Sequence, residues 1–541
     1  MIARANGHLA TDAVRARHLL NLKPGMSHEK HLRSPPLEYL LTEPSSSGTS
    51  TPVPEDAPPS VHSISSVRKQ VRARRRLFYT IDYIPRVSHF DPESDYHDFR
   101  GFFTLFWVAL FVMVVTTVLR NIKDTGYPLR VKVWSILSEN VWQLALSDLA
   151  MVASTVLTWP IHLLIRRSSD WLRWSKGGMV IHSLFQVVWL VVWIKWPFML
   201  RWSWTAQVFL TLHTLTLLMK IHSYAFYNGH LSETERRLSE LDSLDAQSES
   251  ALMAAAVRYP SSPIRERDGK GGLALGQNRE PLRKLREDLA LELTSPLGHI
   301  TYPQNLTFFN YVDFLFCPTL CYELEYPRTQ RLRWLQLLLK SLAVFGCIFL
   351  LTLTSEEFIL PVLTDANRRL PMTSSPSEKG LILAETISLL LFPFIITFLL
   401  VFLVIFEYVL GAFAEITCFA DRHFYSDWWN SRDWLEFSRK WNIPVHHFLR
   451  RHVYFSSKSH FSTSTAMFIT FFVSSIAHEL VMSCITKKLR GYGFLMMMMQ
   501  LPIVAVQRSK LIRNQTTLNN VFFWVSIIIG LSMICVLYVL V

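Results

Sequence analysis

The chain is 541 residues long; half of its residues are hydrophobic and only 18% are charged. Several apolar runs approach the ~20 residues that a helix needs to cross the hydrocarbon core of a bilayer. This composition excludes a soluble globular protein and predicts a polytopic, all-α membrane protein. The net charge of +13 bears on which loops face the cytosol and on whether a substrate is anionic. We expect no nucleic-acid partner.

The first 90 residues have the composition of a disordered tail. Residues 44–66 are rich in Ser, Thr and Pro, and a basic run follows at residues 68–76. This run either orients the first membrane span or contacts anionic lipid head groups. We therefore expect residues 1–90 to form a basic cytosolic tail and residues 91–541 to form the transmembrane domain.

The transmembrane domain is expected to contain about nine spanning helices. With the N-terminus in the cytosol, nine spans place a polar insert at about residues 228–300 on the cytosolic side. The basic loop at residues 415–460 falls on the same side, in agreement with the positive-inside tendency. The apolar runs lie near residues 102–119, 141–165, 178–199, 204–221, 333–353, 381–412, 466–486, 491–506 and 520–541.

Six cysteines are scattered through the chain, most of them in or beside apolar stretches. The closest two, Cys317 and Cys321, have no second pair or histidine cluster near them in the sequence. The pattern therefore predicts neither a metal site nor a disulfide framework. We interpret all six as small hydrophobic packing residues.

His478 lies in the middle of an apolar run, in the sequence SSIAHEL at residues 474–480. Ionisable residues at membrane depth are costly and are usually paired or functional. A lone neutral histidine in an apolar helix is more often packed and hydrogen-bonded than catalytic, but the carboxylate of Glu479 beside it also requires an explanation. Adjacent residues of a helix point about 100° apart, so Glu479 need not touch the imidazole.

A second group of polar and aromatic residues lies in the basic loop. The sequence FYSDWWN occupies residues 424–430, and WNIPVHH occupies residues 441–447. Dense tryptophan is typical of a helix that lies at the bilayer interface. Aromatic walls with a few polar groups, such as Asp427, Asn430 and Asn442, are also typical of a ligand site. Composition leaves both interpretations open.

Acyl transfer from a thioester to a hydroxyl would use both features. The thiolate leaves readily because its parent thiol has a pKa of about 8.5. The acceptor hydroxyl needs a base, and a neutral histidine such as His478 can supply one, which accelerates such reactions roughly 10²–10⁴-fold. The amide of Asn442 can donate to the carbonyl oxygen as charge builds on it, and the basic loop can bind the phosphates of an anionic carrier.

The FYSDWWN segment resembles the FYxDWWN motif of the membrane-bound O-acyltransferase (MBOAT) superfamily, in the branch of sterol and diacylglycerol O-acyltransferases. His478 and the two residues after it are similar to that branch's intramembrane catalytic histidine. The resemblance covers the chain from about residue 85 to the C-terminus, without residues 240–290. Further similarity to fungal sterol-esterifying enzymes lies in residues 219–230, 452–457 and 487–490.

This resemblance implies the superfamily fold, with about nine helices around a central reaction chamber. It implies an acyl-CoA:sterol acyltransferase that esterifies the 3-hydroxyl of a membrane sterol such as ergosterol, for storage as steryl esters. Fatty acyl-CoA is then a co-substrate, and no cofactor is expected. The resemblance also implies a multi-pass protein of the endoplasmic reticulum membrane that forms a homodimer or homotetramer.

The resemblance also assigns roles to individual residues. His478 would be the general base on the acceptor hydroxyl, and Asn442 would orient or polarise the thioester. Asp427 and Asn430 either contact a ligand or hold the interfacial helix. The residues that lie where relatives contact acyl-CoA are Arg439, His446, Tyr454 and Ser474, and the motif residues are Phe424, Tyr425, Asp427, Trp428, Trp429 and Asn430.

Two alternatives remain open at this point. Residues 318–324, with the sequence PTLCYEL, resemble the diacylglycerol enzymes, although residues 325–329 continue in the style of the sterol enzymes. A diacylglycerol O-acyltransferase that makes triacylglycerol is therefore the second interpretation. A lipid channel or lipid-binding membrane protein is the non-enzymatic alternative, and such a protein would not need a base at His478.

Overall fold

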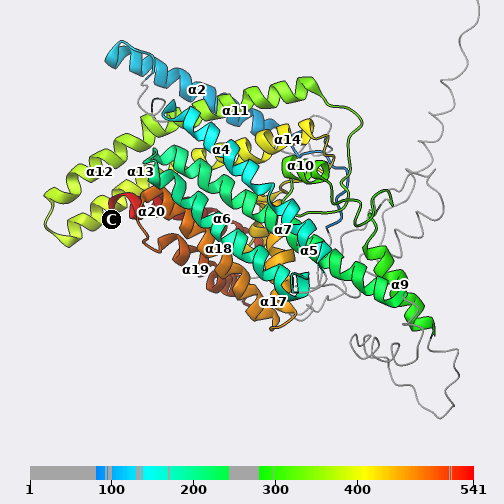
Figure 1. Ribbon diagram of the computed structural model, residues 1–541. Helices are drawn as coiled ribbons and strands as arrows, with labels where there is room; N and C mark the ends of the chain where they lie inside the picture. Colours follow the sequence, from blue (N-terminus) through cyan, green and yellow to red (C-terminus); the bar gives the residue numbers. More distant parts are fainter. Residues whose placement is uncertain are drawn as a thin grey trace, which may run out of the picture. The chain divides into compact units, whose positions relative to one another are not determined.

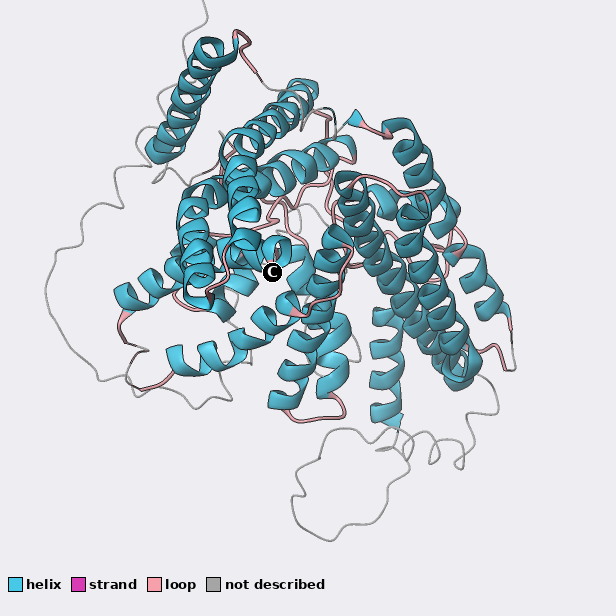
Figure 2. Cartoon of the chain, turned by 90° about the vertical axis from the view of Figure 1, so that its left-hand side faces the viewer, coloured by secondary structure: helices cyan, strands magenta, loops and turns pink. Residues whose placement is uncertain are grey.

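The described residues are mostly helical in the computed structural model (Figures 1 and 2). Extended segments in this part of the chain form isolated bridges but no β-strand, so the all-α expectation is confirmed for it. Most of the expected tail, up to residue 80, and residues 243–278 of the insert lie outside the described residues. The structure describes residues 81–91, 94, 100–129, 135, 138–168, 171–242, 279–296, 298–510, 512 and 514–541.

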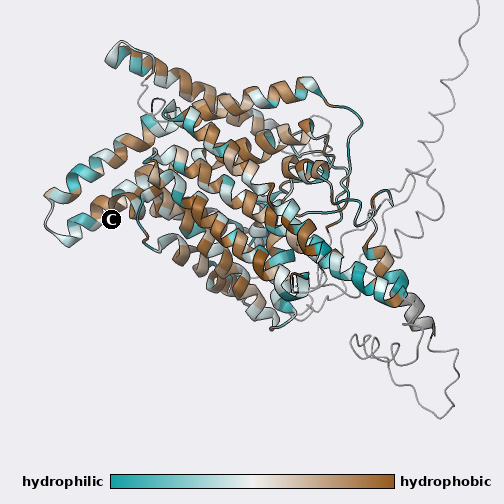
Figure 3. Ribbon diagram, in the orientation of Figure 1, coloured by the Kyte–Doolittle hydropathy of each residue, from teal (hydrophilic) through white to brown (hydrophobic). Residues whose placement is uncertain are grey.

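All nine predicted apolar runs fall within helices. Among the described residues, 7 helical stretches are long and apolar enough to cross a membrane, and α19 (Tyr492–Gln507) is a shorter apolar helix. The remaining run lies in the first half of α7 (Trp204–Asp242), whose second half is polar. Figure 3 shows apolar residues along these helices and hydrophilic residues on α9. The 7 stretches are Gly101–Thr125, Val141–Arg167, Trp174–Met199, Trp334–Met372, Pro376–Ile416, Thr463–Thr486 and Thr516–Leu540.

Short π-helical turns occur inside three of these membrane stretches. A π-helical turn accommodates an extra residue and frequently marks a functional position. The remaining helices are α2 (Arg100–Thr125), α4 (Val141–Thr155), α5 (Thr158–Arg167), η3 (Trp174–Gly178), α6 (Met179–Met199), α9 (Arg279–Glu292), α10 (Phe308–Phe316), α11 (Trp334–Thr354), η5 (Ser355–Ile359), α12 (Leu360–Met372), α13 (Pro376–Phe402), η6 (Leu403–Val409), α14 (Leu410–Ile416), η7 (Trp428–Asn430), α15 (Trp434–Lys440), α16 (Ile443–Phe448), η8 (Leu449–Tyr454), α17 (Phe455–Lys458), α18 (Thr463–Thr486) and α20 (Thr516–Leu540).

The long helix α7 packs against α4, α5, α6 and α18, and its polar second half packs against α9. Helix α18 packs in turn against α19 and against the π-helical turn η8. Helix α20 lies against α13, and α11 lies against η6 and α14. These contacts bring the segment between α14 and α18, which contains the aromatic motif, onto the helices of the membrane stretches.

Several ionisable residues that interrupt the apolar runs have partners, which lowers the cost of charge at membrane depth. Asp148 is 2.6 Å from Nδ1 of His213. The ammonium of Lys340 donates to Glu407 at 2.8 Å. The ammonium of Lys220 donates to three backbone carbonyl oxygens at the C-terminal end of α10 and beyond, at 2.7–3.0 Å. Each pair or set joins helices that are distant in the sequence.

Residues 81–90, expected at the end of the tail, pack against the helical domain together with Asp91. Arg86 forms an ion pair with Asp421 at 2.7 Å, and the backbone N–H of Ile84 donates to the same carboxylate at 3.1 Å. The hydroxyl of Ser88 donates to Glu407. The tail therefore ends earlier than the sequence suggested, because this segment supplies hydrogen bonds to buried carboxylates.

The polar insert also begins later than expected. Helix α7 continues to Asp242, and Asn228 within it is fully buried. Asn305, 2% exposed, donates to the side-chain oxygen of Asn228 at 2.8 Å and to the hydroxyl of Tyr322 at 2.9 Å. Asn228, at the start of the expected insert, is thus part of a buried hydrogen-bond network with Asn305 and Tyr322. A polar composition alone does not predict such a network.

Candidate active site

His478 lies in the middle of α18. Its Nδ1 atom is 2.8 Å from the carbonyl oxygen of Ser474, one turn earlier in the helix. A carbonyl oxygen only accepts hydrogen bonds, so in the neutral imidazole Nδ1 carries the proton and Nε2 has the lone pair. The ring is exposed on the described chain rather than enclosed by it. The geometry presents an imidazole nitrogen that can accept a proton from a neighbouring group.

Glu479 is buried, with 7% exposure, and binds other helices. Its carboxylate accepts the backbone N–H groups of Gly491 (2.8 Å) and Phe494 (3.1 Å) at the beginning of α19. The hydroxyl of Tyr538 in α20 donates to it at 2.6 Å. A carboxylate is stabilised at a helix N-terminus by the free N–H groups and the helix dipole. Glu479 therefore joins α18, α19 and α20, which explains its presence beside His478.

Asn442 is the N-cap residue of α16, where asparagine is strongly preferred. Its side-chain oxygen accepts the N–H of Val445 at 3.1 Å. The N–H of Ile443 donates to the carbonyl oxygen of Phe424 at 3.0 Å, which ties the cap to the aromatic motif. The amide nitrogen of Asn442 makes no hydrogen bond to any described residue. It can therefore donate to a ligand while the oxygen holds the helix.

Three of the residues expected to bind acyl-CoA share one electrostatic neighbourhood. Burial lowers the pKa of Arg439, and the charges of Arg508 and Arg450 lower it further. Burial, Arg450 and Arg439 together lower the pKa of His446 to about 3, so this imidazole is neutral at physiological pH. We call the group the cation cluster; it comprises Arg439, Arg450, Arg508, His446 and Tyr454.

The cation cluster has the chemistry of a site for a multiply charged anion. Arg508 donates to Asp433 at 3.2 Å, but Arg439 forms no ion pair with a described residue. Like charges held close together destabilise one another, and an anion between them removes that repulsion. Arginine pairs with phosphate oxygens through charge-assisted, often bidentate hydrogen bonds. The cluster is thus suited to phosphate groups.

The aromatic motif at residues 424–430 packs into the domain through most of its members. Trp428 is 1% exposed, and its ring lies 4.9 Å from that of Trp441 and 5.1 Å from that of Phe402. The hydroxyl of Tyr425 donates to Glu407 at 3.0 Å. The ammonium of Lys440, at the end of α15, lies 3.0 Å from Asp427. The motif therefore connects η6 with α15.

Asp427 is ionised in this arrangement. Burial opposes its ionisation, but hydrogen bonding and charge attraction from Lys440, with hydrogen bonds from Ser426 and Asn430, hold its pKa below the ordinary value. Asn430, by contrast, is exposed, and its amide lies 3.5 Å from Asp427. The contacts of Asp427 are those of a residue that holds α15 in place.

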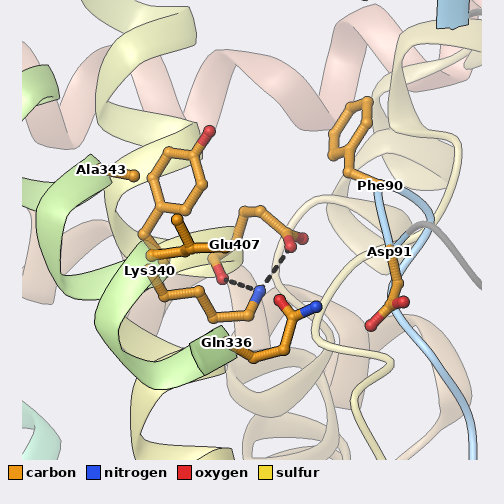
Figure 4. A pocket seen from close by; sticks show the side chains of 8 residues that line it. Phe90, Asp91, Gln336, Lys340, Ala343 and Glu407 are labelled. Carbon is orange, nitrogen blue, oxygen red and sulfur yellow. Dashed lines mark hydrogen bonds and ion pairs between the residues drawn. The ribbon is translucent and has the colours of Figure 1, made fainter. Parts of the chain in front are cut away.

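A cavity of about 250 Å³ lies between the N-terminal segment, the beginning of α11 and η6 (Figure 4). Lys340 and Glu407 form a buried ion pair in its wall. Phe90 and Asp91 line it from the N-terminal segment, and Gln336 lines it from α11. None of the predicted site residues lies in its lining. The sequence signal for this region is a pair of ionisable residues inside apolar runs, Lys340 and Glu407.

The sequence model of the membrane-bound O-acyltransferase (MBOAT) family matches residues 101–540, which is most of the chain. The chain belongs to this family. The family resemblance noted in the sequence is thereby confirmed, together with its expectation of a polytopic helical membrane protein.

Relatives of this MBOAT chain are similar over most of its length. It is 38% identical over 477 residues to a probable sterol O-acyltransferase 2 of Schizosaccharomyces pombe, which covers 87% of this chain and 93% of that protein. It is 34% identical over 471 residues to a sterol O-acyltransferase 2 of Candida albicans, with 82% and 75% covered. A diacylglycerol O-acyltransferase 1 of Dictyostelium discoideum is 35% identical over 259 residues, which cover 47% of this chain and 40% of that protein.

The structure of this MBOAT chain brings some predicted site residues together. Arg439, His446 and Tyr454 share the cation cluster, and Ser474 lies one turn before His478. Helix α18 packs along η8, which ends at Tyr454. No hydrogen bond joins Asn442 to His478 in the described structure. Sequence reasoning did not single out Arg450 and Arg508; their signal was only the general excess of basic residues around them.

Proposed function

We propose that this MBOAT protein transfers a fatty acyl group from acyl-CoA to the 3-hydroxyl of a membrane sterol, forming a steryl ester and free CoA. The observation that carries this proposal is similarity to sterol O-acyltransferases over 82–87% of the chain, against 47% for the diacylglycerol enzyme. Ester formation would serve sterol storage in the endoplasmic reticulum membrane, with ergosterol as the expected sterol, and the enzyme would act as a homodimer or homotetramer.

His478 acts as the general base in the proposed reaction. As the sterol oxygen attacks the thioester carbonyl, Nε2 of His478 takes the hydroxyl proton, while Nδ1–H stays bonded to Ser474. The C–S bond of the tetrahedral intermediate then breaks, and the CoA thiolate takes that proton to become the thiol. The new C–O bond is the ester, and the imidazole returns to its starting state. No metal or other cofactor is required by this sequence of steps.

Asn442 and the cation cluster serve acyl-CoA. The amide nitrogen of Asn442 donates to the carbonyl oxygen, where negative charge develops. The guanidinium groups of Arg439, Arg450 and Arg508 bind the phosphate groups of CoA, and neutral His446 adds a hydrogen bond without further charge repulsion. The aromatic motif holds α15, and with it Arg439, against η6.

A diacylglycerol acceptor is the second candidate. It is favoured by residues 318–324 and by the 35% identity to the diacylglycerol O-acyltransferase of Dictyostelium discoideum, although this similarity covers less of the chain. The chemistry at His478 is the same for both acceptors, because each presents a hydroxyl group. The two functions therefore differ in the acceptor and in the ester that is formed from it.

A competition experiment tests the proposal. Purified protein receives labelled oleoyl-CoA together with a sterol and a diacylglycerol, and the labelled products are separated. We expect steryl ester as the main product, and we expect His478→Ala to reduce its formation by roughly 10²–10⁴-fold. His460→Ala is the matched control, because His460 is an exposed histidine outside the site.

The outcomes separate the candidates. Triacylglycerol as the main product would mean that the sterol assignment is wrong. Undiminished ester formation by a well-folded His478→Ala variant would remove the histidine from the mechanism. If the wild-type protein forms no ester from either acceptor but still binds lipid, a lipid channel or lipid-binding protein becomes the better interpretation.

A further inference from the structure

The π-helical turn η8 carries both residues of the cation cluster and residues that anchor it to other parts of the chain, and Tyr454, Arg451 and His452 are all buried. Arg450 and Tyr454 belong to the cation cluster. Arg451 is fully buried, with 0% exposure, and His452 is 9% exposed. The turn thus holds acyl-CoA-facing residues in a position that depends on what Arg451 and His452 contact.

Arg451 anchors the turn to the extended segment at residues 318–324. Its Nη1 donates to the carbonyl oxygen of Tyr322 at 2.9 Å and lies 3.2 Å from the carboxylate of Glu323. Its guanidinium lies over the ring of Tyr227, 4.5 Å from the centroid. Glu323 is 3% exposed. Breaking a buried ion pair leaves an uncompensated charge, so a displacement of η8 away from Glu323 would cost free energy.

His452 provides a second, independent anchor. Its Nε2 is 3.0 Å from the hydroxyl oxygen of Ser223 in α7. The same oxygen accepts the backbone N–H of Tyr322 at 2.9 Å, which leaves the hydroxyl proton for another partner. Just before the turn, Phe448 belongs to the same hydrophobic cluster as Leu320 and Cys321 of the extended segment. The segment at residues 318–324 therefore meets η8 through an ion pair, a shared hydrophobic cluster and a bridging serine.

We propose that residues 318–324, together with Ser223, form the template that positions η8 for acyl-CoA binding. Glu323, Ser223, Arg451 and His452 are then positioning residues, since they act on the substrate only through Arg450 and Tyr454. This inference rests on the proposed use of the cation cluster by acyl-CoA. It gives a function to the PTLCYEL segment that is independent of which acceptor the enzyme takes.

The test measures the KM for acyl-CoA and the KM for sterol separately. Glu323→Gln keeps the shape of the side chain but removes the charge that faces Arg451. We expect the KM for acyl-CoA, measured at saturating sterol, to rise about 10-fold, because small displacements of binding groups cost rate and affinity steeply. We expect the KM for sterol, measured at saturating acyl-CoA, to stay unchanged. Glu233→Gln is the matched control. Glu233 is a buried carboxylate whose partners, Arg173 at 2.6 Å and the backbone N–H of Ser175, do not belong to η8, and the variant should leave both KM values unchanged.

Ser223→Ala tests the second anchor without touching the ion pair. It should also raise the KM for acyl-CoA and weaken the equilibrium binding of CoA alone, while Arg451→Lys, which keeps the positive charge, should be milder than Arg451→Met. Unchanged KM for acyl-CoA in both Glu323→Gln and Ser223→Ala would overturn the template. Equal rises in both KM values would also overturn it, because they indicate a general loss of structure. An inactive wild-type protein would instead overturn the proposed function.

Discussion

His478 and Glu479 are neighbours in sequence, but their surroundings differ. The histidine ring is exposed, and among the described residues its hydrogen bond is to Ser474 of its own helix. The glutamate accepts four hydrogen bonds, three of them from α19 and α20. Consecutive residues of a helix point in different directions, so His478 can face a substrate while Glu479 holds α18 against α19 and α20. The carboxylate therefore affects catalysis through the position of α18.

Glu479→Ala should destabilise the protein without a specific effect on chemistry. The substitution leaves the N–H groups at the start of α19 and the hydroxyl of Tyr538 without their acceptor. We expect the free energy of unfolding to fall by about 2 kcal/mol, measured as a lower melting temperature. Glu479→Gln, which keeps one acceptor oxygen, should lose less. A variant with an unchanged melting temperature but no activity would indicate that Glu479 takes part in the reaction.

His446 should make the protein less stable as the pH falls below about 6.5. Its pKa is about 3 in the folded protein and about 6.5 in the unfolded chain, so the unfolded state binds more protons between these values. Stability from the neutral imidazole is fully present above about pH 6.5 and is lost as the pH falls toward 3. His446→Gln should therefore flatten the decline of melting temperature between pH 7 and pH 5.

Two neighbouring histidines limit the size of that effect. Burial also lowers the pKa of His423, to about 3, and lowers the pKa of His447. The His446→Gln variant should therefore retain part of the wild-type slope. Added CoA should flatten the wild-type slope further, because phosphate groups in the cation cluster stabilise a protonated imidazole. Identical slopes in the wild type and the variant would contradict the neutral state of His446.

At the scale of an element, the aromatic motif around η7 connects η6 with α15. Trp428 is buried among aromatic rings from α13, α15 and α20. Trp428→Ala removes these contacts and should cost about 3–5 kcal/mol of stability, measured by thermal unfolding. Asn430→Ala, at an exposed position of the same motif, should change stability by no more than about 0.5 kcal/mol. If Asn430→Ala instead raises the KM for acyl-CoA, the motif contacts the substrate directly.

The helices could be predicted from the sequence better than the contacts between them. All nine apolar runs are helical, because burial of apolar side chains and internal backbone hydrogen bonding act locally. The π-helical turns could not be predicted, since they depend on partners far along the chain, as η8 depends on Glu323. For the same reason the sequence identified Arg439, His446 and Tyr454 through family resemblance, but gave no reason to select Arg508, which follows α19 as its C-cap residue.

At the scale of the whole molecule, the segment at residues 81–91 belongs to the catalytic domain. Its ion pair between Arg86 and Asp421 and the bond between Ser88 and Glu407 join it to buried carboxylates. The sequence placed residues 81–90 in the tail because they follow a long polar stretch, although residues 81–91 include apolar and aromatic side chains such as Ile81 and Phe90. Composition does not reveal that Arg86 and Ser88 of this segment pair with buried carboxylates, so the boundary was placed too late.

Two deletions test this boundary. A chain that lacks residues 1–80 should form ester at a rate close to that of the full chain. A chain that lacks residues 1–91 should unfold at a lower temperature, because Asp421 loses its ion pair and Glu407 loses a donor. The double variant Arg86→Ala/Ser88→Ala is the control that removes these contacts without shortening the chain. Equal melting temperatures for the two deletions would show that residues 81–91 are dispensable for the fold.

The buried amide of Asn305 has a consequence for quality control during biosynthesis. Asn305-Leu306-Thr307 matches the acceptor pattern for N-linked glycans. In the folded protein, the nitrogen that would carry the sugar donates to Asn228 and Tyr322 inside the domain. A glycan at this position is incompatible with those contacts. A chain molecule that carries a glycan at Asn305 has therefore not formed these contacts. Because Asn514-Gln515-Thr516 also matches the acceptor pattern, an endoglycosidase assay on an Asn514→Gln variant would report the fraction of chains in which Asn305 has escaped its buried network.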